Sequence, residues 1–142
     1  MSQSFDIKGF LPYLLNQAAE KSSTDFQNIY KSKYGMLRTE WRVMFHLARY
    51  GNLSAQKICE ISGLHKTKVS RAVKALSDKR FITRTKDSYD RRFEILSLTT
   101  KGKNAYQYLE KQAATFDQKL MENFDEQERV ILTQSLKKLI EG

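Results

Sequence analysis

A short helix, a glycine turn, a basic helix and a charged hairpin follow one another between Ser54 and Leu98. Ser54 can cap the short helix AQKICEI, and Gly63 interrupts it. The next helix is expected to bury one face, because its apolar residues recur at three- and four-residue spacing: Val69, Ala72, Val73 and Leu76. The pieces FIT and FEILSL are rich in β-forming residues and flank a charged stretch, which predicts a two-stranded hairpin.

Positive charge is concentrated in the same region. The chain has 142 residues and a net charge of +9, with 25 Lys and Arg against 16 Asp and Glu. Between Gly63 and Arg92, ten Lys or Arg against three Asp leave +7 of that +9. The outward face of the basic helix mixes cations with short hydroxyls, the combination that suits phosphate and base-edge contacts in DNA: Lys66, Thr67, Lys68, Ser70, Arg71 and Lys74. This order of elements is that of a winged helix-turn-helix.

Helices are also predicted before this region. Apolar residues recur with helical spacing from Pro12, and the helix is expected to end near Gly35. Thr39 can cap a second helix that stops at Gly51. Its apolar stripe is expected to comprise Trp41, Met44, Phe45 and Ala48, with Val43 and Leu47 beside it.

Two more helices are predicted after the hairpin. One starts at Thr99 or Thr100 and repeats apolar residues as far as Phe124. Asp125 and Glu128 resemble a capping box that opens the last helix. The expected fold class is therefore mainly α with a small two-stranded β wing.

Short motifs carry a resemblance to a known family: Asp90-Arg91-Arg92, then Leu98-Thr99 and Gly102, and the segment SGLHKTKVSRAVKALSDKRFITR. They resemble the MarR family of bacterial and archaeal transcriptional regulators. The resemblance covers essentially the whole chain and implies a single domain over residues 1–142. It implies a winged helix-turn-helix DNA-binding head at about 37–99 and dimerisation helices at about 1–36 and 100–142. A homodimer would bind a pseudo-palindromic operator in double-stranded DNA.

The resemblance also assigns a role to the wing. In the family, the Arg two positions after the motif Asp enters the minor groove, which corresponds to Arg92 here. Asp90 would pair with an Arg and stiffen the turn. The wing residues expected at the DNA are Lys86, Asp90, Arg91 and Arg92.

Members of the family often respond to small phenolic or aromatic acids bound between the dimer helices and the head. The resemblance thus implies a small aromatic or phenolic ligand, in a cleft that four residues could line: Tyr13, Trp41, Phe45 and His46. Asn16 and Gln17 stand where aromatic-acid sensors tend to place Arg. Trp41, Phe45 and His46 also have an alternative to the cleft. The helical spacing of Trp41 and Phe45 fits packing in the core. His46 shares a helix face with Arg42, which favours a polar surface for its imidazole.

Other functional classes have less support in the sequence. Cys59 lies four residues before Gly63, where a small buried residue would allow close packing of the two helices. Neither Cys59 nor the two His residues supply a nucleophile paired with a base. We therefore expect no enzyme activity, no cofactor and no metal. A nonspecific architectural or RNA-binding basic protein remains the alternative, since a basic cluster alone serves backbone contacts.

Localisation follows from hydropathy. No apolar run approaches the roughly 20 residues that a membrane span needs, and the segment MSQSFDIKGF lacks the apolar core of a signal peptide. We expect a cytoplasmic protein that is associated with the nucleoid and not with a membrane.

Overall fold

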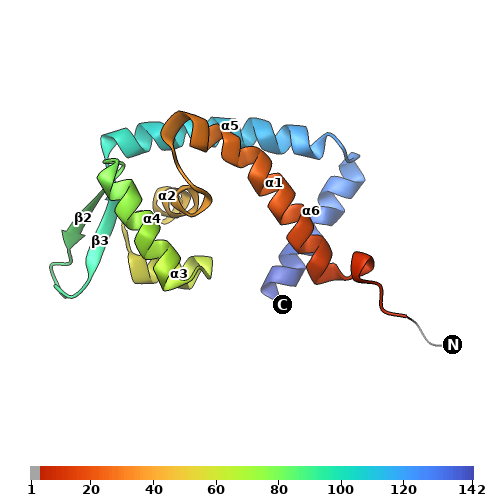
Figure 1. Ribbon diagram of the computed structural model, residues 1–142, viewed down its shortest axis with the longest axis horizontal. Coiled ribbons are helices and arrows are strands. Elements are labelled where there is room, and N and C mark those ends of the chain that lie inside the picture. The colour runs from red at the N-terminus through yellow and green to blue at the C-terminus, as the bar shows by residue number, and fades with distance from the viewer. Residues whose placement is uncertain (1–3) are drawn as a thin grey trace. The chain divides into compact units, whose positions relative to one another are not determined.

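The computed structural model describes residues 4–142, which fall into two units, one up to Leu109 and one from Glu110 to Gly142. After a short 3₁₀ turn, the chain forms six helices and three strands within the described residues (Figure 1). Their bounds are α1 Leu11–Tyr34, α2 Arg38–Tyr50, β1 Leu53–Ser54, α3 Ala55–Ser62, α4 Lys66–Asp78, β2 Ile82–Lys86, β3 Glu94–Leu98, α5 Thr100–Met121 and α6 Glu126–Glu141. None of these helices is long and apolar enough to cross a membrane.

The ends of α1 agree with the prediction. Pro12 lies in the first turn, where its missing N–H costs no helical hydrogen bond. The helix stops at Gly35, whose φ of 66° is a left-handed conformation that glycine adopts without steric penalty.

The start and the buried face of α2 differ from the prediction. Thr39 does not cap the helix; the N–H of Leu37 donates to Glu40 Oε2 at 3.2 Å, so a carboxylate inside the first turn satisfies it. Burial is also shifted around the helix: Val43, Met44 and Leu47 are in the core, Trp41 and Phe45 are half-buried, and Ala48 is exposed. The reason is that α2 is covered on two sides: it packs on α4 and β3, and Trp41 packs against the rings of Phe26 and Tyr30 in α1.

The helix-turn-helix forms as predicted. Ser54 Oγ accepts a hydrogen bond from Lys57 N at 3.1 Å, and the N–H of Gly63, at φ 71°, closes α3 by donating to Cys59 O at 2.9 Å. All four apolar residues predicted for the inner face of α4 are buried: Val69, Ala72, Val73 and Leu76. The prediction that Cys59 is buried is wrong, because Ile58, one position earlier, is the fully buried residue and Cys59 is half-exposed.

The wing is a small antiparallel sheet in the order β1-β3-β2. The predicted hairpin of β2 and β3 is present, with Ile82 opposite Leu98 at its base and Lys86 opposite Glu94 near its tip. The two-residue strand β1 was not predicted, because two residues are too few to show an alternating pattern.

A hydrogen-bonded junction, formed by Arg80, Phe81, Thr99 and Gly102, holds the base of the wing. Thr99 Oγ1 donates to Arg80 O at 2.7 Å and accepts from Gly102 N at 3.0 Å, while the N–H of Thr99 donates to Phe81 O at 3.0 Å. A Cβ on Gly102 would collide with the carbonyl oxygen of Phe81, so only glycine allows this close approach.

The second unit contains the end of α5 and α6. The predicted capping box is confirmed: Asp125 Oδ1 accepts from Glu128 N at 2.8 Å, and Glu128 Oε1 accepts from Asp125 N at 3.0 Å. Most apolar residues of α6 are exposed, namely Val130, Ile131, Leu136, Leu139 and Ile140.

Candidate nucleic-acid interface

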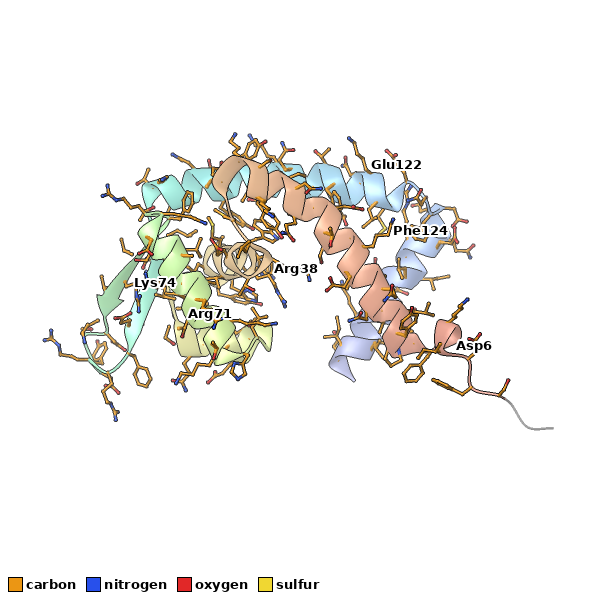
Figure 2. All side chains as sticks on the ribbon, in the orientation of Figure 1. Asp6, Arg38, Arg71, Lys74, Glu122 and Phe124 are labelled. Carbon is orange, nitrogen blue, oxygen red and sulfur yellow. The ribbon has the colours of Figure 1, made fainter. Side chains whose placement is uncertain are left out.

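Helix α4 presents a cationic face opposite its buried one. The six residues predicted for DNA contact are all exposed: Lys66, Thr67, Lys68, Ser70, Arg71 and Lys74. Figure 2 labels Arg71 and Lys74 on this helix. Lys74 is paired with Asp78 at 3.0 Å, but both side chains are largely exposed, and such surface pairs are weak and easily exchanged for other partners.

The C-terminal end of α4 is fixed to its neighbours. Lys79 Nζ donates to the buried carboxylate of Glu40 at 2.7 Å and to Gly35 O at 2.8 Å, and Lys101 Nζ donates to Lys79 O at 3.0 Å. The sequence did not predict this role for Lys79. It is one of the ten cations of the basic cluster, but its ammonium group is bound to Glu40 and Gly35 within the fold. These bonds fix the direction of α4 and leave its N-terminal end exposed.

His65 caps the exposed end of α4. Its Nδ1 accepts a hydrogen bond from Thr67 N at 3.2 Å, so this ring nitrogen is unprotonated in the capped state. This role of His65 was not predicted, because His is uncommon at helix N-caps.

Hydrogen bonds also order the wing tip, residues 87–93. Asp87 N donates to Phe93 O at 2.9 Å and Phe93 N donates to Asp90 O at 3.1 Å. Two side-chain carboxylates add bonds to the backbone: Asp87 Oδ1 accepts from Tyr89 N at 3.0 Å, and Asp90 Oδ1 accepts from Arg92 N at 3.1 Å. The tip is therefore a defined turn although most of its side chains are exposed.

The prediction that Asp90 pairs with an Arg is confirmed, and the partner is Arg92. Arg92 donates from Nε at 3.0 Å and from Nη2 at 2.8 Å to the two carboxylate oxygens. The hydrogen bond from the Arg92 side chain lowers the pKa of Asp90, so the carboxylate is ionised at neutral pH. The pair leaves Arg92 Nη1 outside these bonds, on a side chain that is 84% exposed.

A groove of about 390 Å³ lies between α4 and the wing. Its cationic lining comes from both elements: Lys66 from α4, and Arg84, Lys86 and Arg92 from the wing. Glu94 neutralises part of it by pairing with Arg84 at 2.7 Å. The tip of the wing and the N-terminal end of α4 lie at the same end of this unit, away from the start of α5 (Figure 1). Major-groove and minor-groove contacts could therefore be made from one side.

A second cavity, of about 380 Å³, lies between α1 and α2. Of the four residues predicted to line a cleft, Trp41 and Phe45 line this one, and Tyr13 does not. The expectation that His46 lies on a polar surface is wrong, since it is 7% exposed. Its burial is possible because Nδ1 donates to Arg42 O at 2.6 Å and its ring stacks on Phe45 at 4.6 Å.

Two cations from α2, Arg38 and Arg42, also line this cavity. Arg38 binds Glu20 of α1 through Nη1 at 2.9 Å and Nη2 at 3.4 Å, and this bond lowers the pKa of Glu20. Arg38 Nε is buried and has no hydrogen-bond acceptor among the described residues. Neither cation was predicted as a cavity residue, because the family comparison pointed to an Arg on the first helix, whereas both belong to α2.

The elements and the exposed cationic face define a winged helix-turn-helix regulator, and comparison with known proteins agrees. The family model of the MarR family matches residues 34–92. A MarR/EmrR family transcriptional regulator from Acinetobacter sp. ADP1 is 34% identical, with a TM-score of 0.85 and 96% of each chain covered. The chain therefore belongs to the MarR family of transcriptional regulators, which bind DNA and are not enzymes.

Two other relatives extend the comparison. The uncharacterized HTH-type transcriptional regulator YwaE of Bacillus subtilis (strain 168) is 28% identical over 128 residues, which are 90% of this chain and 75% of YwaE. BpsR of Bordetella bronchiseptica, whose DNA binding is regulated by 6-hydroxynicotinic acid, has a TM-score of 0.88 with 99% of each chain covered. At 18% identity, BpsR supports the fold alone.

Proposed function

We propose that this protein regulates transcription by binding a pseudo-palindromic operator in double-stranded DNA as a homodimer, and that a small aromatic anion modulates this binding. The observation that carries the proposal is the exposed cationic face that α4 and the wing share. The C-terminal end of α4 is anchored, because Lys79 there is hydrogen-bonded to Glu40 and to Lys101. An anchored helix can present its side chains to base edges in one defined register.

In this proposal the two parts of the surface read different features of DNA. Helix α4 enters the major groove, where Arg71 donates two hydrogen bonds to a guanine. Arg92 enters the adjacent minor groove with its free Nη1 leading, while Asp90 holds the other side of the guanidinium. A narrow, A·T-rich minor groove has an enhanced negative potential, so Arg92 responds to groove width.

Exposed apolar side chains near both ends of the described chain support a homodimer. At the N-terminal end these are Phe5, Ile7, Phe10, Leu11 and Leu14, and α6 contributes the apolar residues named above. Apolar surface of this extent near the ends of a chain is typical of a protein interface. Two-fold symmetry would place the heads on half-sites about 34–36 Å apart.

The cavity between α1 and α2 supports modulation by an aromatic anion. Its walls combine aromatic rings from Phe26, Tyr30, Trp41 and Phe45 with two guanidinium groups. A ligand carboxylate could accept a hydrogen bond from Arg38 Nε, a buried donor whose lack of a partner costs about 1–3 kcal/mol. BpsR, with its response to 6-hydroxynicotinic acid, suggests the class of compound to try first.

Selection of bound fragments from sheared genomic DNA tests the operator. We expect a few recurrent sites with inverted half-sites, bound at least about 10³-fold more tightly than random duplex at fixed salt. Analytical ultracentrifugation should show a dimer that binds one site. Equal affinity for all duplexes would support a nonspecific architectural protein instead.

The intrinsic fluorescence of Trp41 tests the ligand cavity, because Trp41 is the only Trp in the chain. Titration with 6-hydroxynicotinic acid or benzoate should change the emission in a saturable way and release operator DNA. Arg38→Gln should abolish the change, whereas Arg49→Gln, a substitution on α2 outside the cavity lining, should not. Equal responses of the two variants would contradict the proposed anion site.

A further inference from the structure

The side chain of Tyr89 extends into solvent at the tip of the wing. It is 98% exposed, more than any other large apolar or aromatic residue in the described part of the chain. Burial of its ring therefore contributes nothing to the stability of the fold. A single exposed ring is common on protein surfaces, so its surroundings must carry any functional argument.

The backbone under Tyr89 is held in place. Its N–H donates to Asp87 Oδ1 at 3.0 Å, and the bond between Asp87 N and Phe93 O closes the turn at 2.9 Å. The ring is thus presented from an ordered hairpin, and binding would not have to pay for ordering a loose loop.

The neighbours of Tyr89 do not form an apolar patch. Tyr89 is flanked in the turn by Ser88 and Asp90 and then by two arginines, and the next large apolar residue along the chain is Phe93. A protein partner would find a single ring surrounded by charge. Cations next to an aromatic ring are instead the combination with which proteins bind phosphates and pack against sugars or bases.

We propose that the ring of Tyr89 packs against the sugar wall of the minor groove that Arg92 enters, and so supplies an uncharged part of DNA binding and of the preference for a narrow groove. This inference rests on the placement of the wing in the proposed function. Because the ring releases no counterions from DNA, its contribution should not depend on salt, in contrast to that of Arg92.

Binding isotherms on the selected operator at several salt concentrations test the inference. We expect Tyr89→Ala to weaken binding about threefold to tenfold at every salt concentration, with an unchanged slope of log affinity against log salt. Tyr89→Phe keeps the ring and should stay within about twofold of the original protein. Ser88→Ala, at the adjacent exposed position, is the matched control and should change nothing.

Three outcomes would overturn the inference. Tyr89→Ala could bind as the original protein does, or it could lower the salt slope as a lost charge would. A third is that Tyr89→Phe loses as much affinity as Tyr89→Ala, which would assign the contact to the hydroxyl and not to the ring. Failure of the proposed function is distinguishable, because the original protein would then show no preference for any operator and Arg92→Ala would have no flank-dependent effect.

Discussion

The base and the tip of the wing hairpin are built in different ways. At the base, Leu96 is 1% exposed, and Gly102 lies so close to Phe81 that no side chain fits between them. At the tip, the side chains are mostly exposed, and the turn is held by hydrogen bonds to Asp87 and Asp90. Close packing supports the base, and local polar bonds support the tip. We therefore expect substitutions in the base to change stability, and substitutions of Tyr89, Asp90 and Arg92 in the tip to change DNA binding.

The largest expected effect is on stability, at Leu96 of the base. Leu96→Ala removes a fully buried side chain from the central strand and should lower the free energy of unfolding by about 2–5 kcal/mol. Urea unfolding followed by circular dichroism measures it. An equally large loss for Tyr89→Ala at the tip would contradict the difference between the two ends.

Gly102→Ala should destabilise the base by a smaller amount. The new Cβ would meet the carbonyl oxygen of Phe81, a backbone atom that cannot rotate away, and overpacking of this kind costs about 1–3 kcal/mol. Gly9→Ala is the control, since a Cβ there meets no atom within 4 Å. Equal unfolding midpoints for the two variants would show that the junction can shift.

At the tip, Arg92→Ala should lower DNA affinity without changing the unfolding midpoint. Loss of one phosphate-neutralising charge should reduce the salt slope by about 1, with the greatest loss of affinity on operators with A·T-rich flanks. Lys21→Ala removes an exposed cation of α1 as a control. Equal losses on A·T-rich and G·C-rich flanks would show that Arg92 lies outside the minor groove.

The smallest effect is expected at Asp90, which acts through Arg92. Asp90→Asn can keep the bond to Arg92 N but loses the ion pair, whereas Asp90→Ala loses both, so affinity should decrease in the order original, Asn, Ala. Arg92 lowers the pKa of Asp90 in the folded protein. Its contribution should therefore be complete above the usual Asp value of about 4 and be lost only as the pH falls through the lowered pKa.

A pH titration of the three proteins, with operator binding as the readout, checks this order. Between pH 5 and about 8 the Asp90 pair should stay ionised, so any change of affinity in that range must come from other groups. A wild-type protein that loses the advantage over Asp90→Asn near neutral pH would contradict the assigned direction of the pKa.

Several local features were predictable from sequence. The glycines that end α1 and α3 adopt left-handed backbone conformations, the capping box opens α6, and all four apolar residues expected on the inner face of α4 are buried. Each of these depends on residues within a few positions of one another. The segregation of charge into residues 63–92 is likewise a property of the sequence alone.

Other features were decided by contacts between distant segments. Periodicity shows that apolar residues of α2 share a face. Because α2 is covered on two sides, periodicity could not show that Ala48 is exposed and His46 is buried. A list of cations likewise cannot show that Lys79 is bound by Glu40, 39 positions earlier in the chain, or that Arg38 lines a cavity. Helix ends and charge distribution are local properties of the sequence, whereas burial and pairing depend on which elements the tertiary structure brings together.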